Sequence, residues 1–440
     1  MKFLGNTVPT SLANTYRRNL FLQKFAGVLG VDILVKASAF LLIPLYLRLM
    51  SQDEFGLYNY LLSIVQTFSL VLNFGLYIPQ SKLYHTYHTE KERGRLLFTI
   101  AATLFLALLV ILLPLILFGW DANLIGLLFK NSQSYRSYRV VVLAALPITI
   151  ASFILTNFFY TSEKIRQVKT YNLYRVIFVN ILALSTLFIL KSDPVQIRLG
   201  VSYAVEVVLF IFFAHSYLKE WVPQFDWRLM KNSLKMGLPV MLSALFGIVI
   251  NFSDKFFLER FGSLKDLSNY YLAFSFASII PLIFTSLQNV WFPQFLKEQD
   301  LGKNIQNSKK LSKKMVILFA GLALCIWLLF CCLLWKGIIP HKYNQAALIL
   351  PLLLVTQIIV SLATLFNNYL VYFEKTQFIS YAGLFVSLIS LTLGMWLIPQ
   401  WGVYGAAVSS LLANTVYLVI YYYLSLTFKK KYFERLAVQQ

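Results

Sequence analysis

Long apolar segments separated by short polar connections run through almost the whole 440-residue chain. A helix needs roughly 20 mainly apolar residues to cross the hydrocarbon core of a bilayer. Twelve spans of this kind are predicted, at residues 25–47, 57–81, 96–118, 140–160, 171–190, 199–218, 236–258, 270–295, 315–334, 346–373, 378–398 and 403–428. The longest connection between them, residues 119–139, is too short for a soluble domain. The pattern predicts an all-α integral membrane protein of twelve transmembrane helices.

Composition and the placement of basic residues support this topology. Hydrophobic residues make up 58% of the chain and charged residues 13%, against about 25% charged in soluble domains. Basic residues are retained on the cytoplasmic side of short loops. With the N-terminus inside, most of the 39 basic residues lie in or beside the inner segments. Both termini are therefore predicted to be cytoplasmic.

The chain carries a net charge of +21. In a soluble protein this value would suggest nucleic-acid binding, but here the charge is spread over the inner connections. Contact with anionic lipid head groups is the simpler interpretation, so the sequence predicts anionic lipids and no nucleic acid as partners.

Three dipeptides recur about 210 residues later, in the same order and the same membrane orientation, as expected of a duplicated bundle. They are Asn59-Tyr60 with Asn269-Tyr270, Pro79-Gln80 with Pro293-Gln294, and Glu163-Lys164 with Glu374-Lys375. The recurrence predicts two six-helix bundles around a central cavity. We expect an N-terminal bundle at residues 1–218, a cytoplasmic linker at 219–235 and a C-terminal bundle at 236–440.

Charged residues inside the spans are the main candidates for a site, because a charge near the bilayer centre costs about 2.5 to 3.5 kcal/mol on insertion scales. Asp32 and Lys36 are four residues apart in the first span, so they share one helix face. Lys36 lies roughly midway across the membrane. The pair could form a substrate site, or the two charges could simply neutralise each other.

Further candidates lie in the later spans. Glu206 is well inside the sixth span, and Asp254 and Lys255 lie near the outer end of the seventh. A lysine so placed can extend its ammonium to the interface, which favours a structural role for Lys255. Arg175, near the start of the fifth span, is included with Lys255 among the possible substrate-binding residues.

Asparagines and glutamines within the spans form a polar series that could line a hydrated path or join helices by hydrogen bonds. They are Asn73, Asn180, Asn251, Gln288, Asn289, Gln357, Asn367 and Asn368. No catalytic or metal site is predicted, and no GxxxxGK loop for ATP is present. We expect no cofactor, with any energy drawn from the substrate or from an H⁺ or Na⁺ gradient.

Three short stretches carry a resemblance to a known family. They are SQDEFGLY at residues 51–58, DKFFL at 254–258 and IPQWGVYGAA at 398–407. They resemble the entry to the second helix, the acidic-basic step in the seventh helix and the turn before the twelfth helix of polysaccharide-type flippases in the multidrug/oligosaccharidyl-lipid/polysaccharide exporter superfamily. Residues 266–270 depart from the family pattern, because they lack its usual glycine.

The resemblance implies a non-enzymatic flippase in the bacterial cytoplasmic membrane. Such a protein moves an undecaprenyl-diphosphate-linked oligosaccharide, such as an O-antigen or capsule repeat unit, from the cytoplasmic to the outer leaflet. Lys36 is then the leading candidate for the cation that holds the diphosphate. Asp32, Glu206 and Asp254 are candidates for coupling to an ion gradient. Contact with the polysaccharide polymerase and chain-length machinery is also expected.

Two alternatives remain at this stage. A cation-coupled drug or small-solute antiporter of the same superfamily would use a similar twelve-helix frame, but its pocket for organic cations should be acidic. A membrane glycan polymerase or ligase would be an enzyme with a large external catalytic loop. The connection at residues 119–139 is too short to match that description.

Overall fold

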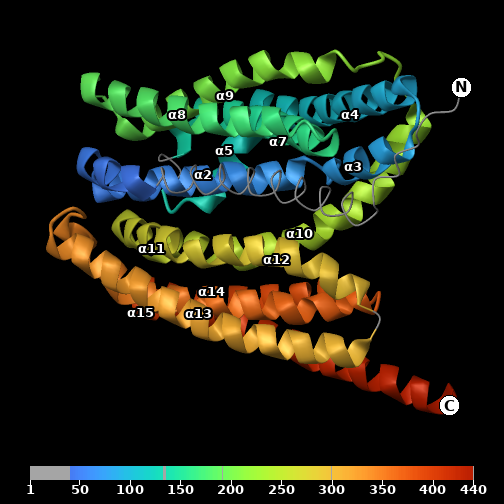
Figure 1. Ribbon diagram of the computed structural model, residues 1–440. Helices are drawn as coiled ribbons and strands as arrows, with labels where there is room; N and C mark the ends of the chain where they lie inside the picture. The colour runs from blue at the N-terminus through green and yellow to red at the C-terminus, as the bar shows by residue number, and fades with distance from the viewer. Residues whose placement is uncertain (1–39, 132–134, 191, 299, 440) are drawn as a thin grey trace, which may run out of the picture.

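The protein is all-helical in a computed structural model. This structure describes residues 40–131, 135–190, 192–298 and 300–439. Within these ranges no strand is present, so the predicted all-helical fold is confirmed. The long helices run side by side along one axis (Figure 1). We call the end that carries residues 119–131 the loop end, and the end that carries residues 219–226 the linker end.

The first half of the chain forms one group of helices, shown in blue and green in Figure 1. A short helix, Phe40–Leu49, precedes the numbered elements. These are α2 (Gln52–Leu72), α3 (Tyr77–Thr86), α4 (Glu90–Leu117), α5 (Trp120–Leu124), the 3₁₀ turn η1 (Gly126–Leu128), α7 (Arg139–Thr161), α8 (Ile165–Ile189) and α9 (Pro194–Leu218).

The second half forms a second group, shown in yellow to red. Its elements are α10 (Trp227–Phe261), α11 (Leu264–Ala277), α12 (Ile279–Lys297), α13 (Leu301–Trp335), the 3₁₀ turn η2 (His341–Tyr343), α14 (Asn344–Tyr372) and α15 (Gln377–Gln439). Helix α10 packs on α15 of its own half and also contacts α3 and α4 of the first half. The linker end of α10 therefore crosses from one group to the other.

Helix α15 turns a corner at Gly402, whose φ of 55° and ψ of −128° are not helical. Pro399 precedes this corner. A Cβ on Gly405 would lie 2.3 Å from the carbonyl oxygen of Leu397, so only glycine allows the chain to fold back this closely. The corner falls between the predicted spans 378–398 and 403–428, as the sequence pattern indicated.

Ten helices in the described ranges are long and apolar enough to cross a membrane, and α15 contains two of the predicted spans. The first predicted span, residues 25–47, lies largely outside the described residues. The count of twelve therefore stays a prediction. The multi-pass character of the chain is confirmed.

The second predicted span, residues 57–81, is wrong as a continuous helix. Helix α2 ends at Leu72, and Phe74 (φ 51°) and Gly75 (φ 66°) both lie in the left-handed region. The side chain of Asn73 accepts a hydrogen bond from the Gly75 amide at 2.8 Å. A Cβ on Gly75 would lie 2.3 Å from the carbonyl oxygen of Gly237. The helix breaks because the backbone of α10 crosses here.

Two matching turns mark the repeat at the linker end. Glu163 and Glu374 have φ of 55° and 58°. After each, a lysine amide bonds back five residues, Lys164 to Phe159 at 2.9 Å and Lys375 to Leu370 at 2.7 Å. This is the Schellman pattern, which usually has glycine at the left-handed position. The recurring dipeptides Glu163-Lys164 and Glu374-Lys375 thus adopt the same conformation.

The two halves contact each other toward the loop end. The Tyr271 hydroxyl on α11 donates to Ser63 Oγ on α2 at 2.8 Å. The ring of Tyr60 stacks on that of Phe252 with centroids 5.7 Å apart. The backbone amide of Lys130 donates to the carboxylate of Glu259 at 2.6 Å.

Candidate functional site

Two predicted site residues, Asp32 and Lys36, lie outside the described residues. Their proposed roles stay predictions. The other four candidates, Arg175, Glu206, Asp254 and Lys255, form two separate clusters, one in each half.

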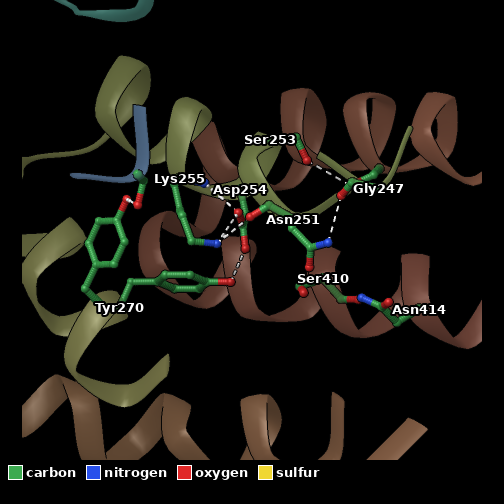
Figure 2. Close-up of polar contacts among 11 residues, drawn as sticks. Gly247, Asn251, Ser253, Asp254, Lys255, Tyr270, Ser410 and Asn414 are labelled. Atoms are coloured by element: carbon green, nitrogen blue, oxygen red, sulfur yellow. Dashed lines mark hydrogen bonds and ion pairs between the residues drawn. The ribbon is translucent and has the colours of Figure 1, made fainter. Parts of the chain in front are cut away.

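The cluster of the second half is built on consecutive residues of α10 and one residue of α11. Lys255 Nζ lies 3.1 Å from Asp254 Oδ1 and donates to the carbonyl oxygen of Asn251 at 2.6 Å. The Tyr270 hydroxyl donates to the other carboxylate oxygen of Asp254. Figure 2 shows these side chains pointing toward one another. A buried carboxylate is thus stabilised by an ammonium and a phenol.

The Lys255 side chain lies inside the protein. Helix α10 continues past the predicted end of the span to Phe261, and the lysine side chain is only 7% exposed. Its ammonium lies 4.6 Å from the centroid of the Phe274 ring and 5.4 Å from that of Tyr270. These rings of α11 lie beside the charge of a lysine that the sequence described as able to extend to the interface.

Lys255 lies between two cavities. One of about 490 Å³ separates the halves and is lined by α2 on one side and by α10 and α11 on the other. The second, of about 240 Å³, lies within the second half among α10, α11, α14 and α15. Lys255, Asn251, Gly247 and Phe274 line both cavities, and among the described residues Lys255 is the one charged residue that does so. The predicted central cavity is confirmed.

The inter-half cavity has a polar wall on α2. This wall consists of Asn59, Ser63, Gln66 and Thr67. Opposite it stand Asn251 and Lys255. Among the described lining residues the polar groups are amides, hydroxyls and an ammonium, with no carboxylate. Such a lining suits a hydroxylated or anionic ligand better than a cation.

The cavity of the second half is also polar. It is lined by Gln357, Thr364, Asn367, Ser410 and Asn414 together with Asp254. Figure 2 shows Ser410 and Asn414 of α15 beside the Asp254 cluster. Asp254 lines only this cavity, whereas Lys255 lines both. The carboxylate therefore faces the cavity of the second half, and the ammonium faces that cavity and the one between the halves.

The predicted polar series divides between the cavities and helix contacts. Asn251, Gln357 and Asn367 line cavities. Other members bond within the protein: the Gly75 amide donates to Asn73, the Tyr46 hydroxyl to Asn180 at 3.1 Å, and Gln288 to Asn368 at 3.0 Å. Both interpretations of the series therefore apply, to different residues.

The cluster of the first half joins α8 and α9. Arg175 Nε lies 2.6 Å from Glu206 Oε2, and the Tyr171 hydroxyl donates to Oε1 at 2.7 Å. The Glu206 side chain is 4% exposed and that of Arg175 is 51% exposed. Neither residue lines the two cavities described above. The geometry gives Glu206 two partners that stabilise its charge between helices.

Sequence reasoning missed Tyr270 and the α2 wall as parts of the site. Tyr270 was singled out only as a marker of the repeat. Polar residues at Asn59, Ser63, Gln66 and Thr67 recur every three or four positions, which places them on one face of a helix. This spacing could have shown the polar face in advance.

Metal ligation has no support in the described ranges, where no group of three or more His, Cys, Asp or Glu side chains comes together. Cys325, Cys331 and Cys332 on α13 are free thiols.

The sequence matches a known protein family over more than half of its length. Residues 21–299 match a family described as polysaccharide biosynthesis protein. The chain belongs to this family. No match was found among curated proteins.

Solved structures share the fold of this family member. The lipid II flippase MurJ in an inward closed conformation is similar, with a TM-score of 0.66, 16% identity, and coverage of 89% of this chain and 87% of that chain. An inward-facing multidrug resistance MATE family transporter of the MOP superfamily has a TM-score of 0.60, 11% identity and coverage of 90% and 97%. A MOP superfamily transporter from Pyrococcus furiosus, described as having a binding pocket of reverse polarity, has a TM-score of 0.58, 12% identity and coverage of 92% and 93%. The fold is that of MOP superfamily transporters and flippases.

Proposed function

We propose that the protein is a flippase for a lipid-linked oligosaccharide whose sugars are joined to a polyprenyl diphosphate. The observation that carries this proposal is the polar cavity between the halves, where Lys255 is the one charged lining residue among those that the structure describes. Membership in the polysaccharide biosynthesis family supports it. Movement from the cytoplasmic to the outer leaflet of a bacterial inner membrane is part of the proposal.

The chemistry of the cavity suits such a substrate. A diphosphate and its sugars cannot enter hydrocarbon without a large desolvation cost. The Lys255 ammonium can donate charge-assisted hydrogen bonds to the diphosphate oxygens and compensate part of their negative charge. The hydroxyl and amide groups of α2 can replace water around the sugars, while the polyprenyl chain stays in the surrounding lipid. Lys36, if it faces the same cavity, would add a second cation.

Asp254 offers a means of coupling. In the present structure it holds Lys255 and accepts a hydrogen bond from Tyr270. Protonation of Asp254, or binding of Na⁺ to it, would weaken its hold on Lys255 and release the ammonium toward a diphosphate. Asp32 and Glu206 stay secondary candidates for coupling. We propose an H⁺ or Na⁺ gradient as the energy source, with no cofactor.

The decisive experiment measures transfer of a polyprenyl-diphosphate oligosaccharide between leaflets of proteoliposomes containing the full chain. Lys255→Gln should reduce the rate at least tenfold, because a charged hydrogen bond contributes about 1.5 to 3 kcal/mol. Lys255→Arg should retain much of the rate. Lys336→Gln, an exposed lysine at the loop end, is the matched control and should transfer normally.

Folding must be separated from transport in this experiment. Lys255→Gln leaves Asp254 buried without its counter-ion, which can itself destabilise a protein by about 3 to 5 kcal/mol. The double variant Asp254→Asn with Lys255→Gln removes both charges and should unfold near the wild-type temperature while still failing to transfer. Wild-type transfer rates in the folded double variant would exclude Lys255 as the diphosphate ligand.

The antiporter alternative shares the fold, since MATE transporters are among the similar structures. The same vesicles should be tested for efflux of a fluorescent organic cation. Cation transport without oligosaccharide transfer would replace the flippase proposal with the antiporter. Lys36→Ala provides a further arm, and full export of surface polysaccharide by this variant would remove Lys36 from the site.

A further inference from the structure

The two matching turns at the linker end differ in charge. In the first half, Lys164 Nζ lies 2.5 Å from Glu220 Oε1, and both side chains are 31% exposed. The Tyr84 hydroxyl also donates to Glu220 at 3.1 Å. An ion pair thus joins the α7–α8 turn to the residues that follow α9.

The second half replaces this ion pair with two cations. The same separation along the chain that relates Lys164 to Lys375 also relates Glu220 to Lys431. Lys375 and Lys431 line one cavity of about 340 Å³. Among the described residues neither lysine forms an ion pair with a carboxylate, and Glu434 lies 3.8 Å from Lys430 instead. The carboxylate of the first half has no equivalent here.

Aromatic rings form the rest of this dibasic cavity. Its lining includes Phe373, Phe378, Phe428 and Tyr432. The rings of Phe378 and Phe428 pack with centroids 5.3 Å apart, so the walls are well supported. Gln377, the first residue of α15, also lines the cavity.

Exposed aromatic and apolar side chains lie on α15 near the dibasic cavity. Tyr381 is 64% exposed, Tyr423 70%, Leu426 43% and Phe433 45%. In a membrane protein, exposed aromatic rings are typical of the head-group level. Lysines beside such rings are suitably placed to meet phospholipid head groups.

We propose that the dibasic cavity binds the phosphate of an anionic phospholipid head group at the linker end. The phosphate takes the place that the Glu220 carboxylate holds in the first half and compensates Lys375 and Lys431. The acyl chains lie against the exposed apolar side chains of α15. The site is separate from the Lys255 cavity and does not depend on the proposed transport function.

Binding can be measured with the purified full chain and a short-chain phosphatidylglycerol that carries a fluorophore on one acyl chain. Fluorescence anisotropy gives its affinity. Lys375→Gln and Lys431→Gln should each weaken binding about fivefold, since each basic residue near an anionic surface contributes about that much. Lys431→Glu should abolish specific binding, because the new carboxylate would pair with Lys375 as Glu220 pairs with Lys164 in the first half. The unfolding temperature of this variant should be at or above that of wild type.

Competition identifies the ligand. Unlabelled phosphatidylglycerol should displace the probe, whereas phosphatidylcholine and inorganic phosphate at equal concentrations should not. The Lys336→Gln protein should bind like wild type. Because the dibasic cavity and the Lys255 cavity share no lining residue, failure here and failure of the transport proposal are distinguishable. Equal affinity of wild type and the double Lys375→Gln, Lys431→Gln variant would overturn the proposal. Displacement by inorganic phosphate would assign the site to a soluble anion instead.

Discussion

Asp121 ties the longest connection of the chain to the helix that follows it. Its carboxylate is buried and accepts hydrogen bonds from Arg139 Nε at 2.6 Å and from the Tyr135 hydroxyl at 2.9 Å. Burial raises the pKa of Asp121, but these hydrogen bonds outweigh it, and the pKa lies below its usual value.

This carboxylate predicts an acid-dependent loss of stability. A depressed folded-state pKa contributes stability above the unfolded pKa of about 3.9, and that stability is lost as pH falls through the folded value. Thermal unfolding of wild type should therefore fall more steeply below about pH 4 than that of Asp121→Asn. Parallel pH profiles of the two proteins would show that Asp121 is not the titrating group.

Tyr270 supplies the second prediction at this scale. Tyr270→Phe removes a donor from the buried Asp254 carboxylate and should cost about 1 to 3 kcal/mol of stability. Tyr271→Phe is the matched control, because it breaks only a neutral hydrogen bond to Ser63, and should cost less. In a double-mutant cycle with Lys255→Gln, the effect of Tyr270→Phe should be non-additive. Additive effects would mean that the three groups do not act together.

Single residues also show where sequence reasoning stops. Hydropathy located charged residues inside apolar spans, but their partners depend on tertiary packing. Arg175 is near the start of one span and Glu206 is in the next, and only the pairing of α8 with α9 brings them together. The rings beside the Lys255 ammonium belong to a neighbouring helix, as Phe274 does, and cannot be foreseen from the segment of Lys255 itself.

At the level of elements, the stretch SQDEFGLY owes its form to two local constraints. Ser51 and Glu54 form a capping box that starts α2. A Cβ on Gly56 would lie 2.2 Å from the carbonyl oxygen of Leu264 at the start of α11. The stretch thus begins a helix and lets the two halves approach closely. Ser263 and Asp266 form the equivalent cap on α11, where the sequence departs from the family pattern.

Gly56→Ala should therefore separate α2 from α11. The added methyl group meets backbone that cannot rotate away, and overpacking of this kind costs about 1 to 3 kcal/mol. Thermal unfolding measures the loss. Gly200→Ala is the matched control, since nothing lies within 4 Å of its Cβ position in α9, and it should be neutral or slightly stabilising. Equal unfolding temperatures for both variants would contradict the close approach.

Element boundaries were predictable where glycine and proline mark them. The corner in α15 follows from Pro399 and Gly402. The break after α2 was not predicted although Asn73 and Gly75 mark it, because apolar residues continue on both sides and the backbone contact lies at Gly237, far along the chain. Hydropathy records how much apolar surface a segment has, and it does not record which backbone crosses it.

On the scale of the whole molecule, the loop end is closed by contacts between the halves. Lys342 Nζ donates to the carbonyl oxygen of Met50 at 3.0 Å, and Arg48 donates to that of Gly337 at 3.0 Å. Gln52 donates to the carbonyl oxygen of Lys342. If the proposed flippase works by alternating access, with the halves opening first on one side of the membrane and then on the other, these contacts must separate.

Cross-linking tests this requirement. In a background with the three native cysteines replaced, a short thiol cross-linker between Gln52→Cys and Lys342→Cys should form readily and block transfer. A cross-link between Lys164→Cys and Glu220→Cys, within the first half, should form without blocking transfer. If transfer continues through the first cross-link, the halves need not part at this end.

Helix α10 belongs to both halves. Its linker-end turns contact α3 and α4, while the helix also packs along α15. Pro239, which lies within α10, removes one backbone hydrogen bond of the helix, two residues after the contact between Gly237 and the Phe74–Gly75 backbone. A rocking motion of the halves would therefore bend this helix. The bend would concentrate at Pro239, where a backbone hydrogen bond is missing, so α10 would store elastic energy when the halves move and return it when they move back.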